Sequence, residues 1–356
     1  MFTLERNVIE MEDENRKVLF FENADIYDNQ LFFVDYDITF LFSFSFLDEK
    51  VRVISKIPEL PLFFQRAFGA VTACNGKIYL APQLSDKLRI YDIKSGKWES
   101  IKIGGITDNS LQFRCMASLN NKLYIAGYDE GGLLCVDENN YSIQCLNSKD
   151  KFGLGYECVG NYLFFPLRER NIILKVDTNT NEIEEIEIDY ENGFCDIAFY
   201  NGTFYLAPEH MGYLLCCDYQ MNDYTNRVFH VKEVGERVSY ISGLARCGSS
   251  LRLFTRHIDR MADYNEGIVT MIEGPSMCCF AENLEGDTCV SCKLFGAVTK
   301  IDKDNSRKEW LMYLSEEELK KACFDNGVNI CRNQNTILYE SGWLSLDYVL
   351  KSLVES

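Results

Sequence analysis

The sequence has few basic residues and no long uninterrupted hydrophobic run. Its 36 lysines and arginines are outnumbered by 54 aspartates and glutamates, which gives a formal net charge of −18. This charge repels phosphate backbones and anionic lipids, so neither nucleic acid nor a membrane is expected as a partner. The longest apolar run, residues 38–47, is about half as long as a membrane-spanning helix.

Signals for secretion and for a disulfide scaffold are also missing. The N-terminal stretch shows no basic segment followed by an apolar one, which a secretory signal would need. The 15 cysteines are odd in number and stand mostly singly in alternating apolar stretches, where reduced cysteine behaves as a small hydrophobic residue. These features predict a soluble cytoplasmic protein with reduced thiols.

A short phrase occurs twice in the chain. It reads NGKIYLAP at residues 75–82 and NGTFYLAP at residues 201–208, and the copies differ at two positions. Weaker copies lie between them at residues 120–127 and 160–167. The aromatic residue of the phrase recurs at intervals of 45, 40 and 41 residues, and looser copies extend the series at both ends: Phe32, Tyr79, Tyr124, Phe164, Tyr205 and Arg252.

Each copy of the phrase lies within a unit of four short stretches. The first stretch is apolar and precedes the Asn-Gly turn, and the second stretch is the phrase itself. The third stretch ends near an aspartate, and the fourth stretch follows a polar turn. Asn-Gly tolerates the positive φ angles of a tight hairpin, so the phrase is expected to join the innermost strand to its neighbour. Four strands in about 40 to 47 residues are typical of a β-propeller blade.

We therefore predict an all-β fold, a β-propeller of four-stranded antiparallel blades. Six units cover residues 21–275, and a composite closing blade is expected within residues 276–356, with residues 1–20 pairing with the last blade. Joining the termini in one sheet would remove free edges. Seven blades are favoured, and six blades with an appendage are the alternative. A β-sandwich is disfavoured because the register of the phrase is kept over six copies.

Two helix patterns follow the repeats. Ser315 and Glu318 stand in a capping-box relation, and Gly327 is the stop signal of the first helix. Its apolar face consists of Leu319, Ala322 and Cys323. Apolar residues at helical spacing also follow Ser345. We expect two short helices at the C-terminal end.

One unit carries a family resemblance. The stretch YDIKSGKW, residues 91–98, resembles the tyrosine and tryptophan that flank the turn between the last two strands of a kelch unit. The chain is thus similar to kelch-type and galactose oxidase-like propellers, although Ala-Pro at residues 81–82 and 207–208 replaces the kelch glycine pair. The resemblance implies architecture only. No tyrosine, histidine and cysteine set maps onto a copper site, and no cofactor is expected.

The candidate ligand-binding residues lie in loops that a propeller gathers at the mouth of its central channel. These are Arg168, Arg170, Glu209, His210, Arg256 and His257. Guanidinium groups match planar anions such as carboxylate or phosphate, and histidine titrates near neutral pH, so His210 and His257 are the weak catalytic candidates. The alternative interpretation is that these loops are charged because they are solvated.

One segment has the cysteine density of a metal site. It contains Cys278, Cys279, Cys289 and Cys292, which include a C-x-x-C pattern. Adjacent side chains on a strand point in opposite directions, so the two neighbouring cysteines are poorly placed to bind the same ion. Buried thiols are favoured over a metal centre.

Two functions fit these observations. The favoured hypothesis is a non-enzymatic, kelch-like scaffold that binds a protein or peptide partner. The alternative is a small-anion or carbohydrate-binding protein, or an enzyme, that uses the Arg/His rim at the channel mouth. No G-x-S-x-G, glycine-rich phosphate loop or H-E-x-x-H pattern occurs. Convergence of the rim side chains on one cavity would favour the second hypothesis.

Overall fold

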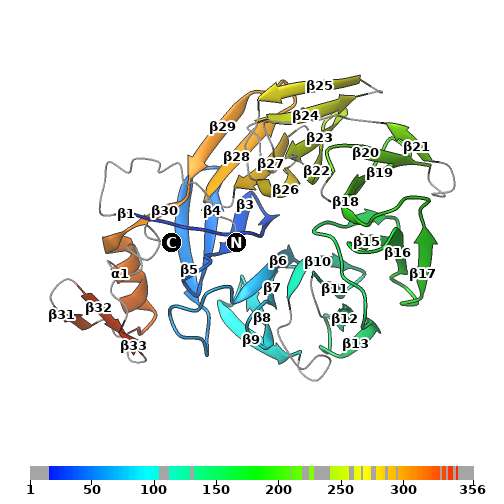
Figure 1. The fold of residues 1–356 in the computed structure, drawn as a ribbon. Coiled ribbons are helices and arrows are strands. Elements are labelled where there is room, and N and C mark those ends of the chain that lie inside the picture. Colours follow the sequence, from blue (N-terminus) through cyan, green and yellow to red (C-terminus); the bar gives the residue numbers. More distant parts are fainter. Residues whose placement is uncertain are drawn as a thin grey trace.

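The chain forms a ring of seven antiparallel sheets. The computed structural model describes residues 16–103, 112–128, 132–209, 211–218, 224–227, 241–255, 260–265, 268–273, 278–284, 288–293, 296–328, 331–333, 336–339 and 342–343. Within them, seven sheets each contain four strands that are consecutive in sequence and paired in that order. The sheets stand around a common centre as the blades of a propeller (Figure 1). The predicted all-β propeller with seven blades is confirmed.

Blades 1 to 4 are numbered in sequence order. Their strands are β2 (Ala24–Tyr27), β3 (Gln30–Val34), β4 (Phe40–Ser45) and β5 (Lys50–Lys56) in blade 1; β6 (Phe68–Cys74), β7 (Lys77–Pro82), β8 (Lys87–Asp92) and β9 (Lys97–Lys102) in blade 2; β10 (Phe113–Leu119), β11 (Lys122–Gly127), β12 (Leu133–Asp137) and β13 (Ile143–Asn147) in blade 3; β14 (Glu157–Val159), β15 (Tyr162–Pro166), β16 (Ile172–Asp177) and β17 (Ile183–Glu187) in blade 4.

Blades 5 to 7 complete the ring. Their strands are β18 (Phe194–Tyr200), β19 (Thr203–Pro208), β20 (Leu214–Cys217) and β21 (Tyr224–Arg227) in blade 5; β22 (Ile241–Cys247), β23 (Ser250–Thr255), β24 (Arg260–Asn265) and β25 (Ile268–Glu273) in blade 6; β26 (Cys278–Leu284), β27 (Thr288–Lys293), β28 (Ala297–Asp302) and β29 (Arg307–Leu311) in blade 7. The first strand of each blade is the innermost. In the order β14, β18, β22, β26, β2, β6 and β10, each of these strands contacts the next one around the channel.

The repeated phrase occupies the same position in six blades. Its aromatic position lies on the second strand and pairs with one residue of the innermost strand: Phe32 with Asp25, Tyr79 with Thr72, Tyr124 with Ala117, Phe164 with Glu157, Tyr205 with Ala198 and Arg252 with Ala245. The Asn-Gly turns adopt the expected positive φ angles, 51° and 74° at Asn75 and Gly76. The phrase recurs because the hairpin that it encodes recurs.

Each interface between neighbouring blades buries its own hydrophobic cluster. Tyr79 and Leu123 belong to the cluster of blades 2 and 3, whereas Ile197 and Phe164 belong to that of blades 4 and 5. Equivalent clusters fill the other interfaces, including the one between blades 7 and 1. A single four-stranded sheet cannot exclude water from both faces, so the blades stabilise one another by stacking.

The two terminal segments meet beside blade 7. Strand β1 (Arg16–Val18) pairs with β30 (Tyr313–Ser315), directly after the last blade. The backbone N–H of Leu19 donates to the carbonyl of Met312 at 2.9 Å, and both side chains belong to the cluster between blades 7 and 1. The four strands of blade 7 are consecutive in the chain, and residues 1–15 lie outside the described part. The division of the chain at residues 20 and 275 stays a prediction.

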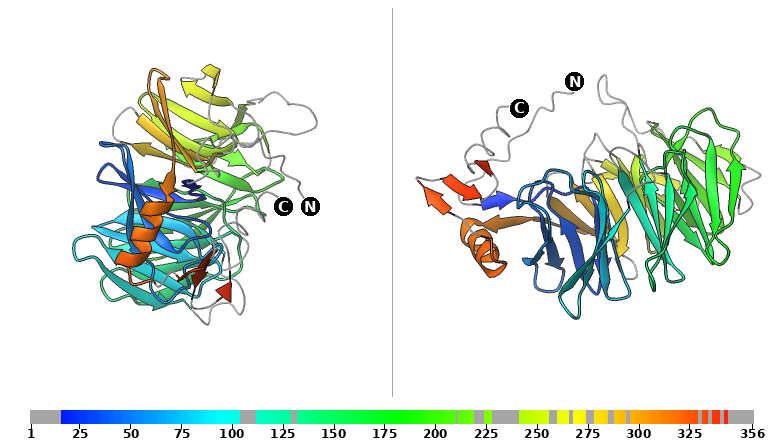
Figure 2. Two further views of the ribbon diagram at one scale, coloured as in Figure 1. Left: turned by 90° about the vertical axis from the view of Figure 1, so that its left-hand side faces the viewer. Right: turned by 90° about the horizontal axis from the view of Figure 1, so that it is seen from below.

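A short helix and a small sheet lie outside the ring. Helix α1 (Glu316–Asp325) packs near β5, and β31 (Cys331–Asn333), β32 (Thr336–Tyr339) and β33 (Gly342–Trp343) form a separate three-stranded sheet (Figure 2). The helix has the predicted capping box and buries its predicted apolar face. The second expected helix, after Ser345, lies outside the described residues. The described helix is too short to cross a membrane.

Removal of the helix cap is expected to destabilise α1. The Ser315 hydroxyl accepts a hydrogen bond from the Glu318 backbone N–H at 3.2 Å, and the Glu318 carboxylate accepts one from the Ser315 N–H at 2.8 Å. Ser315→Ala should lower the free energy of unfolding by about 1 kcal/mol. Urea denaturation measures this change. Ser315→Asp restores a capping oxygen and should be nearly neutral, so an equal loss in both variants would contradict the capping role.

Candidate functional site

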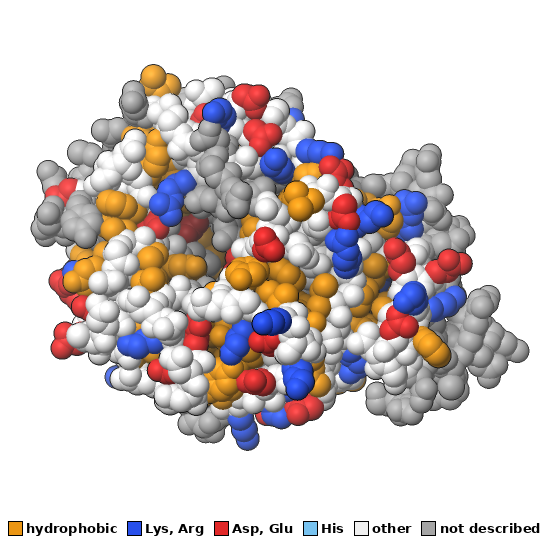
Figure 3. Space-filling model, turned by 180° about the vertical axis from the view of Figure 1, so that it is seen from behind, with side chains coloured by type: hydrophobic (Ala, Val, Ile, Leu, Met, Phe, Trp, Pro, Cys, Tyr) orange, Lys and Arg blue, Asp and Glu red, His pale blue; other side chains and the backbone are white. Residues whose placement is uncertain are grey.

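The innermost strands enclose a cavity at the centre of the ring. Its volume is about 290 Å³, and its walls come from β2, β6, β10, β14, β18 and β22 together with residues next to them. From behind, the molecule is hollowed near its middle, and hydrophobic, basic and acidic side chains are mixed on that face (Figure 3). The cavity therefore lies where the channel of a propeller is expected.

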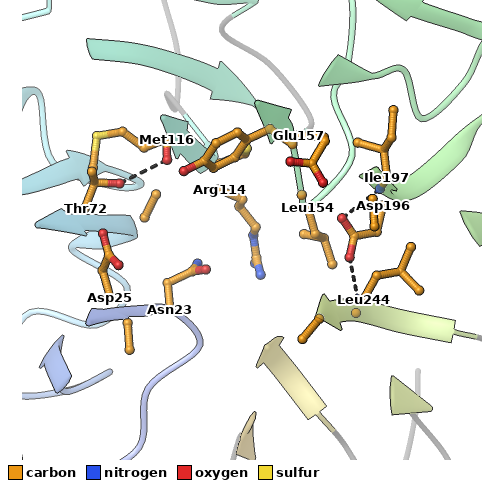
Figure 4. Close-up of a pocket in the computed structure, with 18 of the residues that line it drawn as sticks. Asn23, Asp25, Thr72, Arg114, Met116, Leu154, Glu157, Asp196, Ile197 and Leu244 are labelled. Carbon is orange, nitrogen blue, oxygen red and sulfur yellow. Dashed lines mark hydrogen bonds between the residues drawn. The ribbon is translucent and has the colours of Figure 1, made fainter. Parts of the chain in front are cut away.

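Three carboxyl groups on this wall link successive blades. Asp25 accepts a hydrogen bond from the backbone N–H of Ala73 at 2.6 Å, and Glu157 accepts one from Phe199 at 2.6 Å. Asp196 in blade 5 likewise accepts the N–H of Leu244 in blade 6 at 2.8 Å (Figure 4). The first strand of a blade has an unpaired edge toward the channel, and these carboxyls satisfy its N–H groups.

Each linking carboxyl also binds its own strand. The second oxygen of Asp196 accepts the backbone N–H of Ile197 at 2.8 Å, and the corresponding bonds of Asp25 and Glu157 go to Ile26 and Cys158. Two bonds per carboxyl hold its plane in one orientation. These side chains consequently have a structural role in joining the blades, whatever else the cavity binds.

The environment raises the pKa of two of these carboxyls. Asp196 is 8% exposed, and burial raises its pKa to about 7 against the opposing effect of its two backbone hydrogen bonds. Burial also raises the pKa of Glu157, while the Arg246 guanidinium 3.4 Å away lowers it. Desolvation disfavours the charged form, and here it outweighs the hydrogen bonds that favour it.

A second group of side chains lies at one end of the cavity. We call it the rim network: Glu22, Arg114, Tyr128, Arg168 and Glu209. Arg114 is the second residue of β10, whereas Tyr128, Arg168 and Glu209 come one or two residues after the second strands of blades 3, 4 and 5. The start of a first strand and the end of a second strand lie at the same end of an antiparallel blade, so these residues share the channel mouth.

In the rim network one aromatic ring contacts two guanidinium groups. The Arg168 guanidinium carbon lies 3.9 Å from the centre of the Tyr128 ring, and that of Arg114 lies 5.3 Å from it. Glu209 pairs with Arg168 at 2.9 Å, and Glu22 pairs with Arg114 at 2.5 Å. Burial raises the pKa of Tyr128 to about 12. Cation–π contacts and ion pairs thus hold all five side chains in place.

The structure brings together only some of the candidate loop residues. Arg168 and Glu209 meet in the rim network. Arg170 instead pairs with Asp150 at 2.8 Å and with Glu185 at 2.9 Å, and its side chain is 43% exposed. His210, Arg256 and His257 lie outside the described residues. Their convergence on the cavity stays a prediction.

The described cysteines of the metal candidate point to different blades. Cys289 packs in the cluster between blades 6 and 7, whereas Cys292 packs in the cluster between blades 7 and 1. Both are fully buried. The side chains of Cys278 and Cys279 lie outside the described part of the chain, and within that part no three potential ligand side chains gather as an ion site.

Sequence reasoning missed the cavity walls. Asp25, Thr72 and Glu157 all pair with the aromatic position of the repeated phrase, so they occupy equivalent places in three blades. Tracing each hairpin back across its turn would have located them from the spacing of the phrase. Arg114 and Asp196 occupy other registers and carried no comparable signal.

Comparison with known proteins shows the fold and no family. No family model and no curated protein matches the chain. Among solved structures, hydrazine synthase of Kuenenia stuttgartiensis is similar with a TM-score of 0.62 and 11% identity over 86% of this chain and 99% of that one. A catalytically inactive virginiamycin B lyase from Staphylococcus aureus, solved with quinupristin, gives 0.59 and 11% over 85% and 97%.

A third similar structure is much longer than this chain. PorZ, a surface component of the type-IX secretion system of Porphyromonas gingivalis, gives a TM-score of 0.57 and 12% identity over 84% of this chain, which spans 39% of that protein. Likeness at such identities concerns the fold alone. The kelch type therefore stays a prediction, and the conclusion from the comparisons is that this chain has the architecture of a seven-bladed β-propeller.

Proposed function

We propose that the protein is a non-enzymatic, kelch-like scaffold that binds a protein or peptide partner at the channel mouth. The rim network carries this proposal. Tyrosine and arginine are the residue types that dominate binding energy at protein interfaces. Here Tyr128 is half-buried and contacts both Arg114 and Arg168, so its ring is already fixed before a partner arrives.

Prior fixation lowers the entropic cost of binding. The side chains of Glu209 and Arg168 are 12% and 20% exposed and paired with each other, and those of Glu22 and Arg114 are similarly enclosed. A partner would thus meet side chains whose rotamers are already restricted. The net charge of −18 attracts a partner segment that is positively charged, which favours a basic peptide over an acidic one.

The Arg/His rim as a small-anion or carbohydrate site is the second proposal. One observation favours it: Arg168 and Glu209, two of its six candidate residues, lie together beside the cavity. A cytoplasmic location is a further part of our proposal, supported by the 15 cysteines, which are odd in number and stand mostly singly in apolar stretches of the sequence.

Removal of the Tyr128 ring is expected to abolish most of the partner affinity. A peptide selected from a random display library on the purified protein serves as the probe, and fluorescence anisotropy measures its affinity. Tyr128→Ala should weaken binding by at least about 30-fold, because interface anchors of this type contribute about 2 kcal/mol or more. Tyr128→Phe keeps the aromatic ring that contacts both guanidinium groups and should bind within about threefold of the wild type.

Arg170→Ala is the matched control for the mouth. Arg170 lies two residues after Arg168, but its guanidinium pairs with Asp150 and Glu185. Its loss should change peptide affinity by less than about twofold. Selected peptides that bind Tyr128→Ala as tightly as the wild type would show that the partner surface lies elsewhere.

A further inference from the structure

We propose that the central cavity is a second binding site, for a small uncharged polyhydroxy molecule of about monosaccharide size. The site lies inside the channel and shares Arg114 with the rim network, but its test does not require the partner proposed for the mouth. Its volume of about 290 Å³ lies at the lower end of the range of small-molecule pockets. The same volume corresponds to about ten molecules of liquid water.

The charged side chains on the wall already have partners within the protein: the carboxyls of Asp25 and Asp196 each accept two backbone N–H groups, and the two guanidinium groups pair with carboxylates. Arg114 pairs with Glu22 at 2.5 Å, and Arg246 pairs with Glu157 at 3.4 Å. An anion that approached either guanidinium group would be repelled by the carboxylate paired with it. A cation that approached either carboxylate would be repelled by the guanidinium group. An uncharged ligand avoids both repulsions, which is why we favour it over an ion.

The wall offers hydrogen-bond donors and acceptors side by side. The Arg114 guanidinium projects toward the middle of the cavity, and Asp196 and Asn23 lie on the surrounding wall (Figure 4). A carboxyl group has about four acceptor positions, and Asp196 uses two of them for the N–H groups of Ile197 and Leu244. A hydroxyl group both donates and accepts, so neighbouring hydroxyls of one ligand match an arrangement of this kind.

Apolar surface completes the site. Leu154 and Tyr156 line the same cavity, and Tyr156 is 38% exposed. Carbon-bound hydrogens of a polyhydroxy ring can pack on such aliphatic and aromatic surface while the hydroxyls reach the polar wall. A purely ionic ligand would leave these two side chains unused.

Calorimetric titration of the whole protein tests the site. The probes are a panel of hexoses, pentoses, cyclitols and linear alditols, with inorganic phosphate and spermidine as charged comparisons. We expect saturable binding of at least one uncharged member. Leu154→Trp fills the cavity and should weaken that binding by at least about tenfold, whereas Leu47→Trp, at a side chain that is 82% exposed, should leave it within about twofold.

Tyr156→Ala keeps the test valid if the larger tryptophan disturbs folding. It removes aromatic surface without adding volume and should also weaken sugar binding by several-fold. The proposal is overturned if no uncharged member binds, if phosphate or spermidine binds in preference, or if both cavity variants bind as tightly as the wild type. Two further measurements separate this site from the rim network. Leu154→Trp should keep its affinity for the peptide, and Arg168→Ala, which leaves the cavity wall intact, should keep its affinity for the sugar.

Discussion

Gly155→Ala should lower the free energy of unfolding by at least about 3 kcal/mol. A Cβ atom at residue 155 would lie 1.6 Å from Oδ1 of Asp196 and 2.5 Å from its Cγ. The carboxyl cannot retreat without losing the N–H groups of Ile197 and Leu244, each at 2.8 Å. Leaving a buried polar group unsatisfied costs about 1 to 3 kcal/mol, and two such groups are involved.

Urea denaturation with matched variants tests this steric argument. Gly76→Ala is the control, because a Cβ at that turn would meet no atom within 4 Å and only its φ of 74° is unfavourable. That strain costs about 1 to 2 kcal/mol. In the double variant Gly155→Ala with Asp196→Ala the clash has no target, so the two effects should be less than additive. Additive effects would mean that Gly155 and Asp196 act independently.

The stability of the protein should fall as the pH rises from about 4 to about 7. Asp196 has a pKa of about 7 in the folded protein, and an aspartate in an unfolded chain titrates near 3.9. Between these values the folded state holds a proton that the unfolded state has released. The contribution of Asp196 is therefore fully present below about pH 4, falls by up to about 1.4 kcal/mol per pH unit, and is lost above about pH 7.

The comparison with Asp196→Asn isolates this titration. The variant is expected to be less stable at every pH, because its amide NH₂ would face one of the two backbone donors, but its stability should lack the extra slope. Glu157 also has a raised pKa, so its contribution to stability likewise falls as the pH rises. Glu157→Gln is therefore the second variant to compare with the wild type. Asp92 and Asp137 have lowered pKa values, so their contributions are lost as the pH falls through those values, in a lower window. Parallel pH profiles of wild type and Asp196→Asn would contradict the assignment.

Much of the architecture could be predicted because its signals are local. The Asn75-Gly76 turn, the strand on each side of it and the return of the same pattern in six copies are properties of short segments. The capping box at Ser315 is equally local, and it was predicted correctly. The phrase has the same strand register in six blades, and this follows from the hairpin geometry alone.

The candidate site was predictable only as a region. The position of the loops placed Arg168, Arg170 and Glu209 near the mouth, but it could not tell which partner each would choose. Arg168 stacks on Tyr128, whereas Arg170, two residues later, pairs with Asp150 and Glu185. This difference depends on side-chain direction at the end of a strand, and no spacing in the sequence records it.

The sequence by itself determined the hairpin, the four-stranded unit and the stacking of units into a ring, since turn conformation and alternating burial act over a few residues. Only the tertiary structure decided which groups meet across the channel. Asp196 and Leu244 are 48 residues apart, and Glu157 and Phe199 are 42 apart. Such pairs become neighbours when the ring closes, and the burial that closure imposes is what raises the pKa of Asp196 and shapes the cavity.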